Sequence, residues 1–385
     1  MSMFHDFGFT DEQKMMRESL LQQMAKVMPP ERIRELDRTH QWPHDAYRVM
    51  AEGGWLGLPF SSKYGGLDGG FKDVAILLET LAYHYACLAT AYMTPIIYSG
   101  MHIYQRGSEE LKQMYLPRLI RGEIFIAFAL SEPQAGSDAA SITTRAVRQG
   151  DEYVITGQKT WITSAHVADY FVLVVKTDRE AMPQRNGLSI MLVDAKQPGV
   201  SIQPVETMGR HTTHTNTIYF DGARTPVSHL IGEENRGWKG LMTGLNLERL
   251  CMAAAGAGNA QKAIDIALGY ARERVQFGRA ISSHQVIQHK LADMRIKAEV
   301  ARVMTYRLAD MLDAGQDVRM ETAIAKIVAT ENDFACADTG MQIMGGAGYS
   351  MDHDMQRLFR DSRLGPIGGG SNEIMRNVIA SLMDC

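Results

Sequence analysis

The sequence predicts an α+β fold: a helical N-terminal domain, a middle domain of antiparallel strands forming a barrel or sandwich, and a C-terminal domain resembling a four-helix bundle. Short β-branched and aromatic runs, separated by Gly, Asp, Asn and Pro, fill the middle third of the chain. No proline occurs from Val227 to Gly365, which is typical of consecutive long helices. Alternating strand and helix patterns are absent, which argues against a Rossmann fold.

The first third is predicted to be helical. Thr10 and Gln13 form a capping-box pattern ahead of a helix over residues 11–28, and Pro29 and Pro30 are expected to end that helix. Further helices are predicted near residues 43–52, 71–90 and 108–119, with a loop at 59–70.

The rest of the chain shows two other periodicities. Apolar residues at a spacing of three to four predict a helix over residues 284–312. Gly256 and Gly258 lack the third glycine of a dinucleotide-binding motif and are interpreted as small residues where helices cross.

The expected domains are 1–124, 125–233 and 234–385. Strands are predicted at residues 125–131, 142–147, 153–156, 170–175, 188–193, 200–204 and 217–220.

The composition excludes several classes of protein. The 385 residues are 45% hydrophobic and 22% charged with a net charge of −4, as in an ordinary globular protein, and no basic bias points to nucleic acid. The four cysteines form no CxxC pair, and His211 and His214 lack acidic or cysteine neighbours in the sequence, so no metal site is predicted. Neither a signal peptide nor an apolar run of about 18 residues is seen, and a cytoplasmic protein without a membrane span is expected.

Two motifs of the middle third suggest a ligand. The segment from Ala129 to Asp138 reads ALSEPQAGSD, and its backbone N–H groups and hydroxyls could hold a polar cofactor edge; a mere tight turn is the alternative. About 20 residues later, Trp161 and Thr163 offer a flat apolar face beside a hydroxyl, which suits a ring system. A buried core tryptophan is the alternative there.

A third motif lies near the C-terminus. The segment from Gln342 to Tyr349 carries three glycines and is followed by Asp352, Arg357 and Asp361. Glycines after a helical run allow close approach of phosphates to a helix terminus. A helix C-cap would explain one glycine, but not three.

These motifs, together with the segment from Arg272 to Gln285, resemble the acyl-CoA dehydrogenase family over nearly the whole chain. The resemblance implies FAD, bound between the middle and C-terminal domains of a tetramer, with part of the site supplied by a neighbouring subunit through Arg274, Phe277 and Gln285. The cofactor-binding residues that it implies are Phe128, Leu130, Ser131, Gly136, Ser137, Trp161, Ile162, Thr163, Arg274, Phe277, Gln285, Gln342, Gly345, Gly346, Ser371 and Glu373.

One position departs from the family pattern. Most members have a catalytic glutamate in the C-terminal loop, whereas that position here is Gly369. Glu373 matches a FAD-contacting position and is not the base. The resemblance to the branch that includes isovaleryl-CoA and long-chain dehydrogenases points to Glu248 as the base, with its pKa raised by apolar neighbours; a surface glutamate paired with an arginine is the alternative. The Gly369 N–H is expected to stabilise the enolate, and Ser137, Asn246 and Arg249 to contact the substrate.

The implied activity is α,β-dehydrogenation of an acyl-CoA to the trans-2-enoyl-CoA in fatty acid or branched-chain acyl degradation. Electrons would pass to an electron-transfer flavoprotein, and the acyl group stays open. Alternatives within the fold are an acyl-CoA oxidase and a non-dehydrogenating, desulfinase-like enzyme. A DNA-associated relative would need a basic C-terminal domain, but from Arg236 onward there are 18 Lys and Arg against 17 Asp and Glu.

Overall fold

The computed structural model describes residues 7–383, which form two compact units. Unit 1 contains residues up to Glu35, Gly70–Ala89 and Arg249 onward, and unit 2 contains Leu36–Gly69 and Thr90–Glu248. The expected α+β class is confirmed. The predicted domain boundaries stay a prediction. Among the described residues, no helix is long and apolar enough to cross a membrane.

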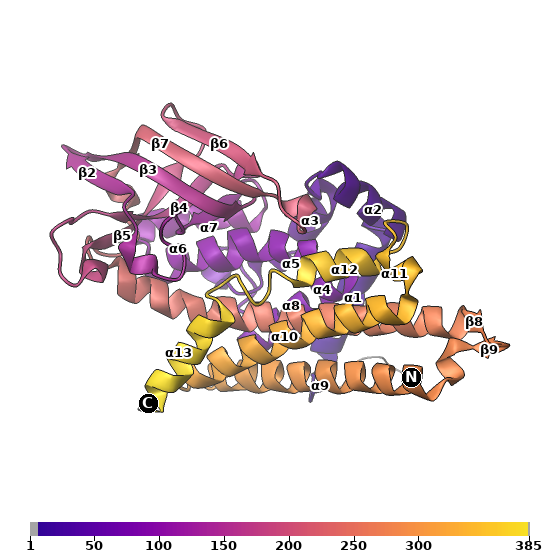
Figure 1. The fold of residues 1–385 in the computed structure, drawn as a ribbon. Helices are drawn as coiled ribbons and strands as arrows, with labels where there is room; N and C mark the ends of the chain where they lie inside the picture. Colours follow the sequence, from indigo (N-terminus) through magenta and orange to yellow (C-terminus); the bar gives the residue numbers. More distant parts are fainter. Residues whose placement is uncertain (1–6, 384–385) are drawn as a thin grey trace. The chain divides into compact units, whose positions relative to one another are not determined.

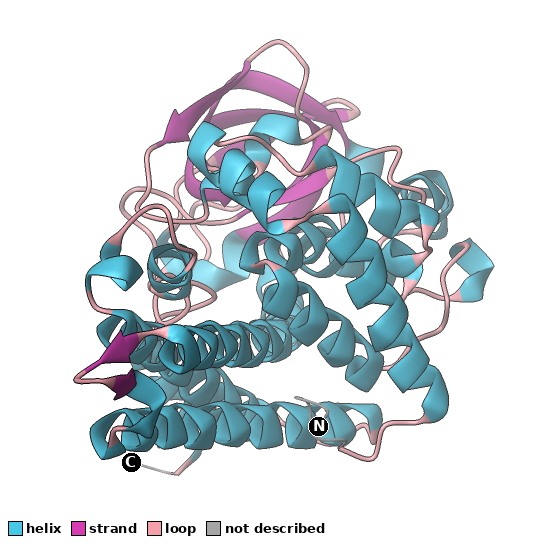
Figure 2. Ribbon diagram, turned by 90° about the vertical axis from the view of Figure 1, so that its right-hand side faces the viewer, coloured by secondary structure: helices cyan, strands magenta, loops and turns pink. Residues whose placement is uncertain are grey.

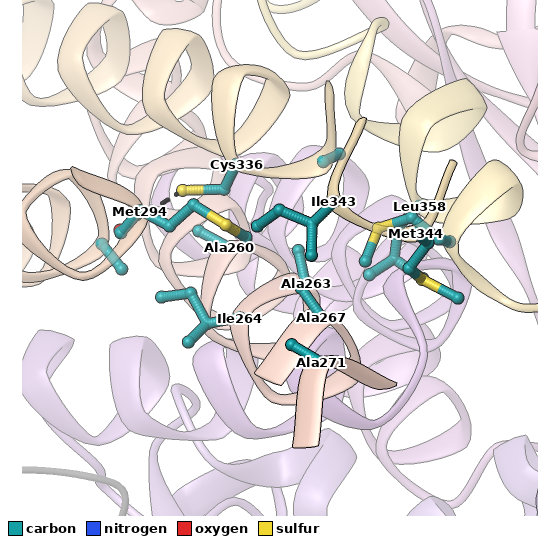
Figure 3. Packing of buried hydrophobic residues seen from close by; sticks show 13 residues of the cluster. Ala260, Ala263, Ile264, Ala267, Ala271, Met294, Cys336, Ile343, Met344 and Leu358 are labelled. Atoms are coloured by element: carbon teal, nitrogen blue, oxygen red, sulfur yellow. Dashed lines mark hydrogen bonds between the residues drawn. The ribbon is translucent and has the colours of Figure 1, made fainter. Parts of the chain in front are cut away.

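Unit 1 is built from helices. The last turns of α8 lie beside α9 and α10 (Figure 1), and their small and sulfur-containing side chains, including Ala263, Met294 and Cys336, fill a shared core (Figure 3). A two-stranded hairpin, β8 and β9, joins α8 to α9 (Figure 2). The helices and strands that lie wholly or partly in unit 1 are α1 (Asp11–Val27), α2 (Pro30–Thr39), α4 (Phe71–His84), α5 (Ala86–Tyr92), α8 (Gly237–Glu273), β8 (Val275–Gln276), β9 (Arg279–Ala280), α9 (Gln285–Asp313), α10 (Arg319–Met344), α11 (Gly346–Tyr349), α12 (Met355–Ser362) and α13 (Asn372–Leu382).

Unit 2 is built around a curled seven-stranded sheet (Figure 2). The strand order is β1-β4-β2-β3-β7-β6, and β5, which is not on this path, pairs with β4. Most pairs are antiparallel as expected, but β4 runs parallel to both β1 and β2, so the first strand enters the sheet by a crossover. The remaining elements of unit 2 are α3 (His44–Glu52), the π-helix η3 (Met93–Gly100), α6 (Met101–Arg106), α7 (Glu109–Ile120), β1 (Ile126–Ala129), β2 (Arg145–Gln149), β3 (Glu152–Thr163), β4 (Tyr170–Lys176), β5 (Leu188–Asp194), β6 (Val200–Val205) and β7 (Thr215–Pro226).

Several local predictions can be compared directly with the structure. The Thr10 hydroxyl accepts from the Gln13 N–H at 3.2 Å and the Gln13 side chain accepts from the Thr10 N–H at 3.1 Å, which confirms the capping box. Pro30 does not merely end α1; it starts α2, because a proline has no N–H to lose at the first helical position. The helix expected over 71–90 is broken at Tyr85, whose backbone is extended.

The small residues of α8 are explained by close helix crossings in unit 1. A Cβ on Gly258 would lie 2.1 Å from the Glu79 carbonyl oxygen of α4, and one on Gly256 would lie 3.1 Å from the Ala329 oxygen of α10. The interpretation of these glycines as a packing feature is therefore confirmed.

Candidate functional site

The ALSEPQAGSD segment begins on β1 and continues into an open loop. Phe128 on β1 is half-buried, as are Leu130 and Ser131 just after the strand. Gly136 and Ser137 are exposed, and a Cβ on Gly136 would meet nothing within 4 Å. The segment thus offers partly exposed side chains followed by a stretch of accessible backbone.

A buried ion pair holds this segment in place. The Glu132 side chain is 1% exposed and that of Lys159 is 0% exposed, with Nζ and Oε1 2.8 Å apart. The Glu132 carboxylate also accepts from the backbone N–H groups of Thr143 at 2.6 Å and Thr144 at 2.9 Å. Burial alone would raise the pKa of Glu132, but the Lys159 ammonium and these hydrogen bonds outweigh burial and lower it to about 2.

Lys159 also links the loop to the second motif. Its Nζ donates to the Leu130 carbonyl at 2.7 Å, and the Thr160 N–H donates to the Ser131 carbonyl at 2.9 Å. Burial lowers the pKa of Lys159 to about 8, against the opposing effect of Glu132. The amine therefore remains mainly protonated at neutral pH. The pair fixes the end of β1 and the end of β3 relative to each other.

An irregularity in β3 turns the Trp161 side chain toward solvent. The register between β3 and β7 shifts between Lys159 and Ile162, and Trp161 has a left-handed backbone with φ of +62°. A bulge re-aims a side chain: Trp161 is 60% exposed while Ile162 is 3% exposed. The expected alternative, a buried core tryptophan, is wrong. A bulky residue in this conformation costs about 1–3 kcal/mol and is typical of ligand-binding positions.

The β8–β9 hairpin projects its predicted ligand-binding residues outward. Phe277 is 95% exposed and has φ of +52°, and Arg274 and Gln285 are also exposed. From Arg249 to Glu273 the chain is one continuous helix, which at about 1.5 Å per residue spans roughly 36 Å. Within one chain, the hairpin is therefore far from Arg249.

The three glycines of the Gln342–Tyr349 motif have different environments. Gly345 is the C-cap of α10 with φ of +57° and ψ of −134°, a conformation that glycine adopts far more easily than other residues. A Cβ on Gly348 would lie 2.8 Å from the Met341 carbonyl oxygen, whereas one on Gly346 would meet nothing within 4 Å. Capping explains Gly345, packing explains Gly348, and Gly346, like the exposed Gln342, is open to a ligand.

Helix α8 carries the predicted base. Glu248 is half-buried between Leu247 and Arg249, which are 5% and 8% exposed. The Asn246 side chain lies outside the described residues. In unit 1, Arg249 Nη2 would lie 3.8 Å from a Cβ on Gly370. The helix position that follows Glu248 therefore lies against the glycine loop.

That loop has the conformation that only glycines adopt easily. Gly369 and Gly370 have φ of +64° and +82°. Ser371 then caps α13 by accepting from the Ile374 N–H at 3.3 Å. Glu373 is exposed in the first turn of α13, and hydrogen bonds from its own backbone N–H and the Ser371 side chain lower its pKa.

The predicted residues thus fall into separate groups. Phe128, Ser131, Trp161 and their neighbours gather at the joined ends of β1 and β3 in unit 2. The hairpin residues lie at one end of the long helices of unit 1, and Arg249, Gly369 and Ser371 lie in a separate part of that unit. Among residues 7–383, no group of three His, Cys, Asp or Glu side chains could hold a metal ion.

Sequence reasoning assigned no role to Glu132, Lys159 or Lys326, which is fully buried in α10. A signal existed for Lys326, because it is a single charge within the apolar run AIAKIVA. For Glu132 and Lys159, 27 residues apart, no local pattern indicates pairing.

Comparisons with known proteins cover nearly the whole chain. Family models described as the N-terminal, middle and C-terminal domains of acyl-CoA dehydrogenase match residues 10–123, 127–223 and 235–383. The chain is 36% identical over 376 residues to a probable acyl-CoA dehydrogenase of Bacillus subtilis, covering 97% of this chain and 98% of the relative. It is 36% identical to acryloyl-CoA reductase (NADH) of Anaerotignum propionicum, covering 97% and 95%. A solved acyl-CoA dehydrogenase from Geobacillus kaustophilus superposes with a TM-score of 0.95 at 32% identity, covering 99% and 100%.

Proposed function

The chain belongs to the acyl-CoA dehydrogenase family, a family of flavin-dependent oxidoreductases, and we propose that it converts an acyl-CoA to the trans-2-enoyl-CoA with FAD as cofactor and Glu248 as base. The electrons then pass to an electron-transfer flavoprotein. Branched or straight acyl chains are both compatible with a base on α8.

The residues at the ends of β1 and β3 fit a flavin. Trp161 supplies an exposed flat face and Thr163, two residues later, a half-buried side chain with a hydroxyl, while Lys159 fixes the Phe128–Ser131 segment through the Leu130 carbonyl. Gly136 leaves backbone open to the ligand. When bound, FAD supplies the acceptor for the hydride that leaves the substrate β-carbon.

Glu248 takes the α-proton in this proposal. One observation supports this assignment above the others: Arg249, the next residue, lies against Gly370, and Gly369 beside it is where most of the family carries its carboxylate. This contact places the turn of α8 that carries Glu248 beside the loop, and we propose that a carboxylate from either position serves the same α-carbon. The Gly369 N–H donates to the thioester carbonyl and stabilises negative charge on its oxygen, and Arg249 contacts the CoA or orders the helix.

We also propose that the active enzyme is an oligomer, a tetramer as in the family, in which the hairpin of one subunit completes the FAD site of another. Phe277 at 95% exposure supports this arrangement, because so apolar a side chain at a hairpin tip gains from burial against a partner. The span of roughly 36 Å from Arg249 to the hairpin also favours a hairpin that serves another chain.

A second candidate is the reverse reaction, reduction of an enoyl-CoA. It is favoured by the similarity to a relative named acryloyl-CoA reductase. Glu248 would then donate a proton to the α-carbon. Measuring both directions with the same acyl group separates the two candidates, and oxygen consumption without added acceptor would reveal an oxidase.

The test is Glu248→Gln, which keeps the size of the side chain but removes its basicity. We expect the rate at which acyl-CoA bleaches the flavin to fall by about 10²–10⁴, with FAD content and acyl-CoA affinity nearly unchanged. Glu299→Gln, at a glutamate paired with Arg295 on α9, is the matched control and should bleach at the wild-type rate. Bleaching of Glu248→Gln at the wild-type rate would place the base elsewhere.

A further inference from the structure

Lys326 is a buried cation with contacts to the glycine loop. It lies on α10 and is 0% exposed. Its Nζ donates to the Gly370 carbonyl at 2.9 Å and to Asn372 Oδ1 at 2.8 Å. Burying an ammonium group carries a desolvation cost. A lysine buried at this position is therefore expected to have a specific function.

The glycine loop that Lys326 contacts has little of its own to restrain its backbone. Its two ends are held by backbone hydrogen bonds, from the Asn372 N–H to the Pro366 carbonyl and from the Gly368 N–H to the Leu364 carbonyl, both at 2.9 Å. Between them, Gly369 and Gly370 have no side chains to restrict their backbone, and glycine loses more conformational freedom on ordering than other residues. Lys326 holds the peptide carbonyl in the middle of this free stretch.

We propose that Lys326 is a positioning residue: by fixing the Gly370 carbonyl, it holds the Gly369 N–H where it meets the thioester carbonyl of the acyl-CoA. This inference rests on the proposed function. The inference also follows from Gly369, which stands where most of the family has glutamate. A loop with glycine at this position can stabilise the substrate only through its backbone.

If Lys326 served only to pack α10 against α13, weakening that helix contact in another way would have the same effect as changing Lys326. Asn372 also bonds to the Thr330 hydroxyl at 3.2 Å, and this bond joins α10 to α13 without touching the loop carbonyl. Thr330→Val therefore weakens the same helix contact and leaves the Lys326–Gly370 bond in place. The two variants separate loop positioning from helix packing.

The experiment compares Lys326→Met, Lys326→Gln and Thr330→Val as FAD-loaded full-length proteins. With the best acyl-CoA, we expect Lys326→Met to lower kcat about 10²-fold, the scale of a lost oxyanion donor, with KM and FAD content within a few-fold of wild type. Lys326→Gln, which keeps an N–H donor, should lose less, and Thr330→Val should keep near wild-type kcat. Equal kcat losses in Lys326→Met and Thr330→Val, or wild-type kcat in Lys326→Met, which lacks the donor to the loop, would overturn the proposal.

A second measurement does not depend on the reaction. Amide hydrogen exchange of the peptide covering residues 366–371 should be about tenfold faster in Lys326→Met than in Thr330→Val, with Lys326→Gln between the two. If the wild type is reduced by no acyl-CoA, the proposed function fails while this comparison still decides whether Lys326 orders the loop. Equal exchange in the Lys326 and Thr330 variants would overturn the positioning role whatever the activity.

Discussion

The buried pair of Glu132 and Lys159 makes the segment proposed to hold the flavin sensitive to acid. The pKa of Glu132 is lowered from its ordinary value of 4.5 to about 2. A carboxyl group whose pKa is lower in the folded than in the unfolded chain stabilises the fold above pH 4.5, and this stabilisation is lost as pH falls toward 2. This lowering of the pKa corresponds to about 3 kcal/mol in full, of which somewhat less than half is lost at pH 3.5.

Two backbone amides report this loss locally. The Thr143 and Thr144 N–H groups donate to the Glu132 carboxylate, so they become exposed when it is protonated and the loop opens. Between pH 6 and pH 3.5, after correction for the intrinsic exchange rate, hydrogen exchange in a peptide covering residues 143 and 144 should accelerate about tenfold, the size of this loss. Mass spectrometry of peptic fragments measures it.

The matched control removes both charges. Glu132→Gln alone would leave Lys159 buried without its carboxylate, a change that typically costs about 3–5 kcal/mol. The double variant Glu132→Gln, Lys159→Met avoids the uncompensated ion and should show no such acceleration. The same tenfold acceleration in the double variant would assign the effect to other carboxyl groups, and none in the wild type would refute the lowered pKa.

Two further predictions concern the remaining parts of the proposed site. Arg274→Ala and Phe277→Ala should reduce FAD retention and subunit association together, the arginine by about 1.5–3 kcal/mol for a charge-assisted contact to phosphate; unchanged FAD content and sedimentation in both variants would contradict a shared site. Glu248→Gly combined with Gly369→Glu should recover part of the flavin bleaching lost in Glu248→Gly alone, but not all of it, since a glutamate at φ of +64° adds about 1–2 kcal/mol of strain. No recovery in a double variant that folds and keeps FAD would mean that residue 369 does not face the α-carbon.

The sequence predicted the elements best where a repeating pattern of side chains decides the backbone. The runs predicted at 170–175, 188–193 and 200–204 correspond to β4, β5 and β6 with nearly the same bounds. Alternating or continuous runs rich in β-branched residues favour strands over other structures. The capping box of α1 was equally readable, since both of its bonds are local. By contrast, the parallel pairing of β1 with β4 depends on a crossover that no local pattern encodes.

The residues of the candidate site could be predicted from motifs, but their contacts could not. Trp161 and Gly369 were found through motif resemblance, but not how they are held. The exposure of Trp161 follows from a register shift against β7, which depends on the partner strand. Lys326 meets Gly370 across 44 residues of sequence. Such contacts form only once the helices have packed, so the sequence could indicate that Lys326 is buried but not which carbonyl it meets.

These observations together suggest how the loop can function without its glutamate. A glutamate at residue 369 would need space for its side chain and a strained backbone, since the loop there is left-handed. Glycine removes the strain but also removes the rigidity that a side chain gives, and a backbone donor is useful in catalysis only if it is pre-organised. In the proposed arrangement the ammonium of Lys326 supplies that order from α10, while Arg249, the residue after the proposed base, lies against the same loop. In this arrangement, proton removal and carbonyl stabilisation, which the majority of the family draws from one residue of the loop, are divided between Glu248 on α8 and the peptide of Gly369. The division predicts that variants of Lys326 and of Glu248 impair different halves of the same step and that their effects on kcat are not independent.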